Sequence, residues 1–341
     1  MSGRRLLPGL VAAAVLLYGA GAGAAVWKVG PEEALTLPSQ AARMAGDGDT
    51  VEIAAGEYFD CAVWPQRDLT ITGSSDRLAP TVLTDAACQG KALFVVMGRG
   101  VTIRHLTFTR VRVPDGNGAG IRAEGPDLTV AHSRFINNQS GIVAADAPDG
   151  TLAILDSVFE RNGAARDERC VATVQAGRLR VLRVERSRFG FARACDMVRG
   201  AARRTEVVDS RFEDGPAGAA QAMLALAGGD VLVRGSSFAK GTKAAPPDVA
   251  ILVRDLWGGG GVVEVRDSVL ANDSGRRVAL VHNLSAGRAV LAGNRVGPGD
   301  VELDESGFWV ARTRSMARDA VDTARGVAGK VTRGVRGLLP F

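Results

Sequence analysis

Apolar and polar residues alternate along most of this chain, and the alternation recurs as a repeated unit. Each unit is a short strand with apolar residues at every second position, and it ends in a large apolar residue. These terminal residues are Phe108, Phe135, Phe159, Phe189, Phe212, Phe238, Leu270 and Val296. The intervals between them are 27, 24, 30, 23, 26, 32 and 26 residues. A repeat of this length predicts a stacked array, in which each unit buries its apolar face on its neighbours.

A period of two indicates strands with one face inward and the other toward water. We therefore expect Val130, Ile154 and Val208 to be buried together with the column of phenylalanines. Helical periodicity is absent between about residues 50 and 300, which argues against leucine-rich and ankyrin arrays. Another apolar strand precedes each repeated strand, so two strands and a shorter third one complete a coil.

Asparagine follows the terminal residue of several units at a short, regular distance. Asn138 and Asn162 follow it by three residues and Asn272 by two. Asparagine tolerates the left-handed backbone conformation of sharp turns. We therefore interpret these residues as turn formers and not as ligands.

The first residues have the pattern of a secretory signal. Arg4 and Arg5 precede an apolar run over residues 10–17, and the small residues "GAGAGAA" follow. This order predicts a cleaved signal peptide over residues 1–24 and a periplasmic or extracellular protein. An uncleaved anchor is the alternative, but the apolar run is shorter than the roughly 20 residues of a spanning helix.

The net charge of +5 is concentrated at the two ends of the chain. Residues 312–341 carry seven basic and two acidic residues, and Arg4 and Arg5 lie in the signal, which leaves the body close to −2. A body without a basic stripe does not fit nucleic acid as a partner. In the tail, over 301–341, apolar residues recur at steps of three and four from Ser315 onward, as in an amphipathic helix. Such a helix would pack on the protein itself or bind an anionic membrane.

The four cysteines form two pairs of similar spacing. Cys61 and Cys88 are 27 residues apart, and Cys170 and Cys195 are 25 apart. An even number of cysteines in an exported chain predicts disulfides. Because there is no CxxC motif and the three histidines are scattered, we expect no zinc site.

The units of type "LTVxxSxFxxN" and the opening "LPSQAARMAGDGDTVEIAAGEY" resemble the right-handed parallel β-helix proteins of the pectate-lyase-like group. The resemblance covers about residues 35–300. It implies an all-β solenoid over 48–300, preceded over 25–47 by a cap with a short helix that Ser39 caps. Each cysteine pair would then lie one coil apart, about 4.8 Å in strand spacing, which is within the reach of a disulfide.

Enzymes of this group place catalytic residues on outward positions of adjacent coils, and "GIRAEG" offers two such positions. Arg122 would neutralise a uronate carboxylate and Glu124 would transfer a proton, although the pair also fits a surface ion pair. Arg254 is a third candidate substrate contact. Catalytic aspartate pairs of the hydrolase type are absent from the sequence, so an enzyme would resemble a polysaccharide lyase.

The same outward column is otherwise apolar, with strands such as "SGIVAA" and "MLALA", and only Lys91, Arg199, Arg254 and His282 add charge near it. An apolar ladder is typical of a covered surface or a partner site. "DAPDG", with Asp146 and Asp149, lacks the further acidic residues of a calcium loop, so no metal or cofactor is expected. Two hypotheses follow: a protein that binds or processes an acidic polysaccharide, or a non-catalytic envelope protein that docks another protein.

Overall fold

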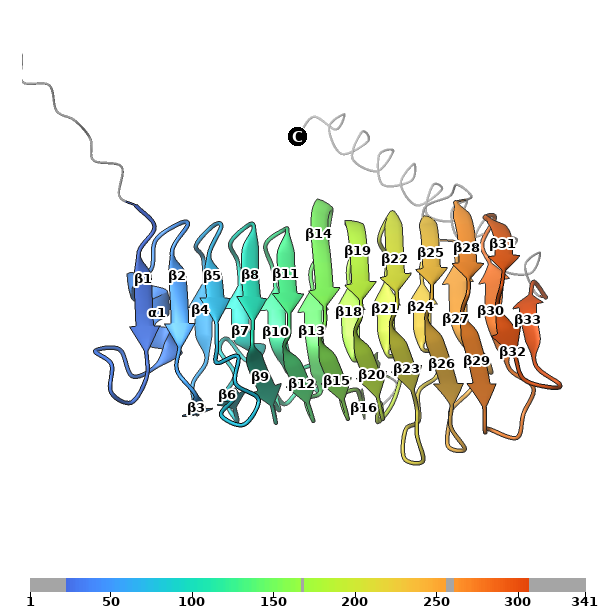
Figure 1. The fold of residues 1–341 in the computed structure, drawn as a ribbon, viewed down its shortest axis with the longest axis horizontal. Coiled ribbons are helices and arrows are strands. Elements are labelled where there is room, and N and C mark those ends of the chain that lie inside the picture. The colour runs from blue at the N-terminus through green and yellow to red at the C-terminus, as the bar shows by residue number, and fades with distance from the viewer. Residues whose placement is uncertain (1–22, 167–168, 256–260, 307–341) are drawn as a thin grey trace, which may run out of the picture.

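The computed structural model describes residues 23–166, 169–255 and 261–306, which form one parallel β-helix (Figure 1). Three sheets, of 11, 10 and 10 strands, form the solenoid; the first coil contributes only β1, and each later coil contributes one strand to each sheet. All neighbouring strands in these sheets pair in parallel. The all-β, parallel β-helix architecture that the repeat predicts is therefore confirmed.

Sheet A contains the strands that precede the phenylalanine column. Its first strand lies before the predicted start of the solenoid at residue 48, because the short apolar segment at Val26 already pairs with the next coil. Sheet A comprises β1 (Val26–Val29), β2 (Thr50–Ile53), β5 (Thr70–Thr72), β8 (Val101–Arg104), β11 (Leu128–Ala131), β14 (Ala147–Leu155), β19 (Leu179–Glu185), β22 (Arg204–Val208), β25 (Asp230–Arg234), β28 (Val262–Arg266) and β31 (Arg288–Ala292).

Sheet B carries the phenylalanines. It comprises β3 (Gly56–Tyr58), β6 (Thr81–Thr84), β9 (Leu106–Thr109), β12 (Arg134–Ile136), β15 (Val158–Glu160), β20 (Arg188–Gly190), β23 (Arg211–Glu213), β26 (Ser237–Lys240), β29 (Val269–Asn272) and β32 (Arg295–Val296).

Sheet C contains the apolar strands found upstream of each repeated unit. It comprises β4 (Ala62–Trp64), β7 (Ala92–Val96), β10 (Ala119–Ala123), β13 (Ser140–Ala144), β18 (Val174–Ala176), β21 (Val198–Gly200), β24 (Leu224–Leu226), β27 (Val249–Arg254), β30 (Ala279–Leu284) and β33 (Val301–Asp304). An antiparallel hairpin, β16 (Ala164–Arg166) and β17 (Arg169–Val171), lies in the connection between β15 and β18.

The interior of the solenoid contains a continuous column of aromatic rings. The six phenylalanines from Phe108 to Phe238 are fully buried, and neighbouring rings stack with centroids 4.6 to 5.2 Å apart. The residue five positions before each phenylalanine also points inward, as the buried Val130 and Ile154 show. The prediction for Val208 was wrong, because this spacing places Val207 inward and leaves Val208 half-buried.

A single residue turns the chain from sheet A to sheet B. In successive coils this corner is occupied by His105, His132, Asp156, Arg186, Asp209, Gly235 and Asp267, and all have a positive φ between 45° and 60°. The next residue is a buried serine in six successive coils, from Ser133 to Ser268. Each serine hydroxyl after that of Ser133 accepts a hydrogen bond from the backbone N–H of the serine one coil before it, and the Ser133 hydroxyl accepts the N–H of Leu106. This serine ladder satisfies the backbone where the strands are interrupted.

Asn138 and Asn162 have a different role from the one predicted, whereas Asn272 accepts the N–H of Ser274 in a turn. Asn138 and Asn162 are fully buried, and the Asn162 side chain accepts a hydrogen bond from the N–H of Asn138. The left-handed residues are the preceding ones, Asn137 and Arg161, with φ of 57° and 55°. The asparagine side chains therefore bridge coils from inside the turn, while their neighbours provide the turn itself.

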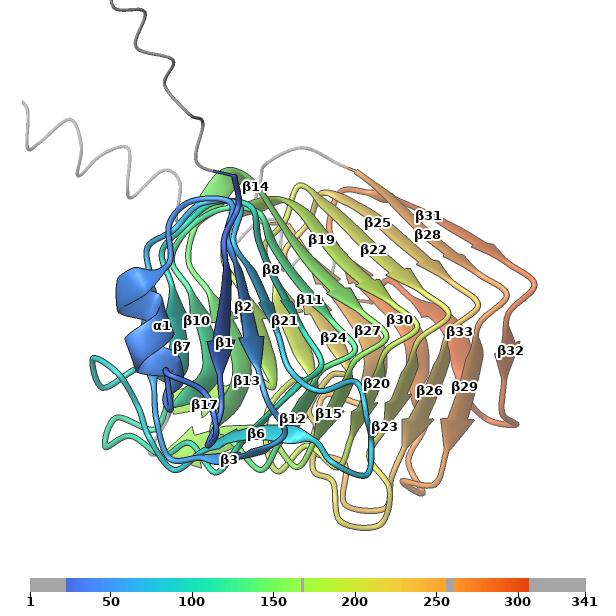
Figure 2. The same cartoon turned by 60° about the vertical axis from the view of Figure 1, so that its left-hand side comes forward.

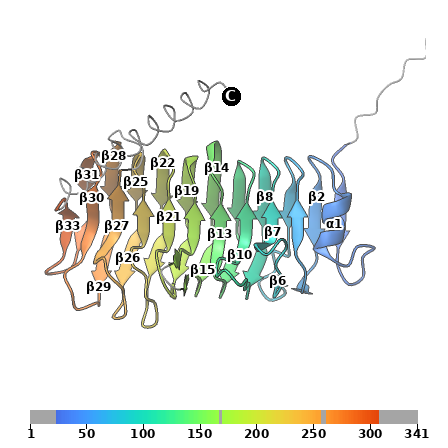
Figure 3. The same cartoon turned by 180° about the vertical axis from the view of Figure 1, so that it is seen from behind.

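The N-terminal end is covered by α1 (Pro38–Met44), which packs against β1 and β4 (Figures 2 and 3). Ala41, a residue of this helix, is fully buried. Ser39 does not cap this helix, because Pro38 occupies the first helical position and places Ser39 inside the first turn. The N–H of Ser39 instead donates to Asp60, at 2.7 Å.

Both predicted cysteine pairs are disulfides between adjacent coils. The Cα–Cα distance is 5.4 Å for Cys61–Cys88 and 5.5 Å for Cys170–Cys195. The predicted signal peptide, apart from its last two residues, and the tail after residue 306 lie outside the described residues. Within the described part of the chain, no helix has the length and apolar character needed to cross a membrane.

Candidate functional site

A groove lies on the outer face of sheet C, near the middle of the solenoid. Parallel register places Arg122, Val143, Gln175 and Arg199 in one row across four adjacent strands. The cavity above this row has a volume of about 390 Å³. Its lining comprises Arg122, Val143, Ala144, Ala145, Asp146, Gln175, Ala176, Gly177, Arg199, Gly200, Ala201, Ala225, Leu226, Ala227 and Arg254.

Arg122 and Glu124 lie on the same exterior face, as the alternation predicts, but only Arg122 lines the groove. The Glu124 carboxylate lies 2.6 Å from Lys91 Nζ, in the preceding coil, and 3.8 Å from Arg122 Nε. Arg122 Nε is buried and has no hydrogen-bond partner among the described residues. Glu124 therefore forms its shorter ion pair with Lys91 and a longer one with Arg122, whose partly exposed side chain lines the groove.

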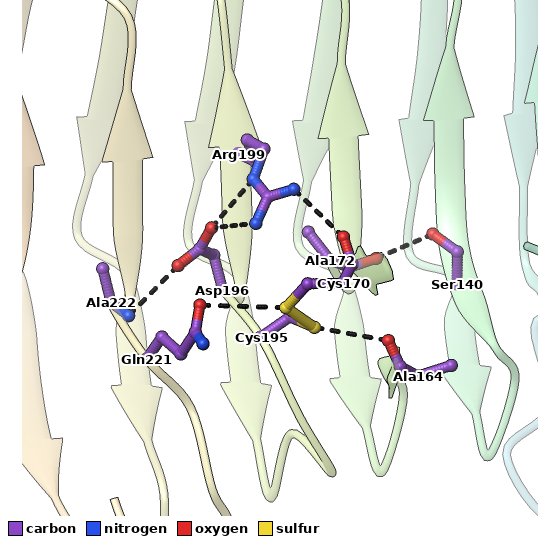
Figure 4. The surroundings of a disulfide bond; sticks show 9 residues. All are labelled: Ser140, Ala164, Cys170, Ala172, Cys195, Asp196, Arg199, Gln221 and Ala222. Carbon is purple, nitrogen blue, oxygen red and sulfur yellow. Dashed lines mark hydrogen bonds and ion pairs between the residues drawn. A yellow bond between two sulfur atoms is a disulfide. The ribbon is translucent and has the colours of Figure 1, made fainter. Parts of the chain in front are cut away.

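Arg199 is held in place by three hydrogen bonds at the edge of the groove (Figure 4). Its Nε and Nη2 donate to one oxygen of Asp196, at 2.9 and 2.7 Å, and its Nη1 donates to the carbonyl oxygen of Cys170, at 3.1 Å. Asp196 is 5% exposed, and its other oxygen accepts the N–H of Ala222. The Cys170–Cys195 disulfide joins the two segments that carry these partners. The Arg199 side chain is therefore oriented before any ligand arrives.

Arg254 is the last residue of β27 and lies at the far end of the groove. No hydrogen bond or ion pair joins it to another described residue. Arg122 and Arg199 are three strand spacings apart, roughly 14 Å. Arg254 lies two strands beyond Arg199 and two residues further along its strand, which places its backbone roughly 12 Å from that of Arg199. The three guanidiniums therefore follow the axis of the solenoid and do not converge on one point.

The floor of the groove is formed by small, mostly apolar residues. The outward residues Val143, Ala225 and Leu252 are only 5, 6 and 3% exposed. They belong to two buried clusters on the outer side of sheet C, which flank the polar residues Gln175 and Arg199. The apolar ladder of the sequence is therefore largely covered, and what remains accessible is a narrow strip between the arginines.

Arginine is the cation best suited to carboxylate ligands, because its planar guanidinium forms two parallel hydrogen bonds and stays charged. Among the described lining residues, Asp146 is the one carboxylate, and its Oδ1 already accepts the N–H of Arg178. The two carboxyl groups of a glycoside hydrolase are therefore not found in this lining. The described residues also contain no group of three or more metal-ligating side chains.

Sequence reasoning named Arg122 and Arg254 as substrate contacts, and both line the groove. It named Arg199 only as a nearby charge and did not consider Asp196. The signal was present in the strand segments "GIRA" and "MVRG", which align Arg199 with Arg122. Asp196 could not be found in this way, because the loop before each sheet C strand varies in length from coil to coil.

No family model and no curated protein sequence matches this chain. Solved structures do match. An alginate lyase from Paenibacillus sp. str. FPU-7 has a TM-score of 0.50 at 13% identity, over 78% of this chain and 95% of that one. The Escherichia coli protein YbhC has a TM-score of 0.50 at 14% identity, over 86% and 88%. At these identities the likeness shows the fold alone: the chain shares a parallel β-helix fold with these two proteins.

Proposed function

We propose that the groove on sheet C binds an acidic polysaccharide that lies along the axis of the solenoid. The observation that carries this proposal is that three different coils place an arginine in one groove: Arg122 and Arg199 in the same row, and Arg254 two residues beyond that row on its own strand. A linear polymer with a repeating carboxylate can contact all three, whereas a compact anion can reach only one. The matched alginate lyase, by its name, acts on such a polymer.

The floor of the groove fits the rest of a sugar ring. Alanine and glycine side chains leave room for a ring to lie flat, and their apolar surface matches its C–H groups. Arg199 loses little conformational entropy on binding, because Asp196 and Cys170 already fix its orientation. Gln175, between Arg122 and Arg199 in the row, supplies an amide for the sugar hydroxyls.

The proposal concerns binding; chemical turnover remains a hypothesis. Glu124, the predicted proton-transfer residue, lies outside the lining and contacts Lys91. The competing hypothesis of a protein-docking face has less support, because the outward apolar residues of sheet C are already buried. Two disulfides fit an oxidising compartment, so we propose that the protein acts in the periplasm or outside the cell.

The test is calorimetric titration of the full chain with oligogalacturonate and oligoalginate. We expect Arg122→Gln and Arg254→Gln each to weaken binding about tenfold, since each removes a charge-assisted hydrogen bond. Arg211→Gln is the matched control, because Arg211 is an exposed arginine on sheet B. Neutral dextran should not bind.

Equal affinity of all three variants for the acidic oligosaccharides, or equal binding of dextran, would overturn the proposal. Absorbance of unsaturated products and reducing-end release, read on the same samples, would show whether binding leads to cleavage.

A further inference from the structure

A second cavity, of about 570 Å³, lies on a different side of the solenoid from the sheet C groove. It is bounded by the loop between β5 and β6 on one side and by the outer faces of β9, β12 and β15 on the other. Nothing in the proposed polysaccharide contact uses this cavity. Its lining combines two histidines with several charged side chains.

His105 and His132 lie side by side at the corner between sheets A and B. Their rings stack with centroids 5.1 Å apart and an angle of 6° between the planes. Both residues have the left-handed conformation, which the following coils achieve with Asp156, Arg186 and Asp209. Histidine is therefore not required by the turn. No hydrogen bond joins either ring to another described residue, so their nitrogens are available to a ligand.

Three carboxylates line the cavity together with the histidines: Asp76, Asp156 and Glu160. Asp156, in the next coil, forms two hydrogen bonds with Arg186, at 2.8 and 2.9 Å. Asp76 accepts the N–H of Leu78 in its own loop. Glu160 has no ion-pair partner among the described residues.

The cations facing the same cavity are arginines. Arg77 and Arg134 have no ion-pair partner among the described residues. Arg188 lies 3.7 Å from Glu213, and Arg104 directly precedes His105 on β8. The site is thus close to neutral when both imidazoles are neutral, and it becomes clearly positive when they are protonated.

We propose that this cavity binds an oxyanion, such as a carboxylate or phosphate group, and that it does so more tightly when His105 and His132 are protonated. Arg134 and the imidazole N–H groups supply the donors. Without a ligand, burial, the neighbouring imidazole and Arg104 lower the pKa of His105. An anion relieves the repulsion between the two rings, so its binding takes up protons and strengthens as the pH falls.

The first test is nuclear magnetic resonance of the histidine side chains in the full chain, with inorganic phosphate and monomeric galacturonate as probes. At about pH 5.5, below the usual histidine pKa, we expect at least one probe to bind about tenfold more tightly than at about pH 8. The signals of His105 and His132 should shift, and the pKa of His105 should rise. His282, which lies on β30 outside the cavity, is an internal control.

Variants separate the site from other anion contacts. His132→Asn tolerates the left-handed turn and should remove most of the pH dependence, and Arg134→Gln, on an exposed position, should weaken binding at both pH values. Arg211→Gln should change nothing. Phosphate binding alone identifies a phosphate site, and galacturonate binding alone a carboxylate site. Binding of neither probe, or binding that His132→Asn and Arg134→Gln leave unchanged, would overturn the proposal.

Discussion

The guanidinium of Arg199 donates two hydrogen bonds to a single carboxylate oxygen of Asp196, at 2.9 and 2.7 Å. Because Asp196 is almost fully buried and Arg199 lines the groove, this contact links a buried charge to the ligand surface. We expect Asp196→Asn to lower the free energy of unfolding by about 1 to 2 kcal/mol, since Arg199 is partly exposed and its pairing is weakened by solvent. Oligogalacturonate affinity should fall several-fold.

Asp248→Asn is the matched control for this substitution. Asp248 pairs with Arg276 at 2.7 Å, on an exposed surface away from the groove. It should change neither affinity nor stability by much. Unchanged affinity of Asp196→Asn, measured by calorimetry, would show that Arg199 does not need its buried partner.

The two disulfides should contribute similarly to the stability of the protein but differently to oligosaccharide binding. They close loops of 27 and 25 residues, so replacing either pair by alanine should destabilise the protein by about 3 kcal/mol in the chain-entropy model. Only the Cys170–Cys195 pair adjoins Arg199, through the Cys170 carbonyl. We expect its loss to weaken oligosaccharide binding at a temperature where both variants are folded. Equal affinities of the two double variants would contradict this.

Each serine of the ladder should contribute more to the free energy of unfolding than a serine on the surface. Ser187 Oγ accepts the N–H of Ser157 at 3.1 Å and donates to the carbonyl of Glu185 at 2.8 Å. Ser187→Ala leaves the buried N–H of Ser157 without its partner, which costs about 1 to 3 kcal/mol. Ser237→Ala, on the outer side of β26, is the control. Denaturant unfolding measures both, and similar midpoints would refute the role of the ladder.

Acid should loosen the N-terminal coil through Asp49. Backbone N–H of Gly46, the indole of Trp27 and the N–H of Ala25 all donate to this carboxylate and lower its pKa. The pKa is thus lower in the folded protein than in the unfolded chain. Its stabilising effect is present above the unfolded value, near 3.9, and is lost as the pH falls through the folded pKa.

The melting temperature of Asp49→Asn should accordingly lie below that of the unchanged protein at neutral pH and approach it in acid. Asp47→Asn, in the same loop, is the control, since its exposed carboxylate bonds only the N–H of Arg67. A difference that stays constant from neutral pH into acid would mean that Asp49 does not titrate as its contacts require.

The fold could be predicted from the sequence because each coil repeats the same strand pattern and the same packing contacts. The phenylalanine spacing predicts the stack, and the cysteine spacing predicts both disulfides, since each needs only the coil length. The predicted position was wrong by one residue where two neighbouring residues of the same type could take the same structural position. Val208 stands beside the buried Val207, and Asn138 follows the left-handed Asn137.

The candidate site could be predicted only in part. Arg122 and Arg254 were found because they lie on strands, where alternation decides which way a side chain points. Asp196, which orients Arg199, lies on the connection between sheets B and C, where no period applies. The helix cap was missed for the same reason, because Asp60 reaches Ser39 from another part of the chain.

The corner between sheets A and B has a further consequence, for the engineering of this scaffold. Its length is the same in every coil from Ile103–Phe108 to Val265–Leu270, whereas the other two connections vary. An extra residue beside Asp209 would move a phenylalanine out of the aromatic column and break the serine ladder at once. A peptide tag or a whole guest domain inserted at residues 242–247, before β27, leaves both the aromatic column and the serine ladder unchanged. The connection between sheets A and B therefore has a fixed length, whereas the other two connections can accept insertions.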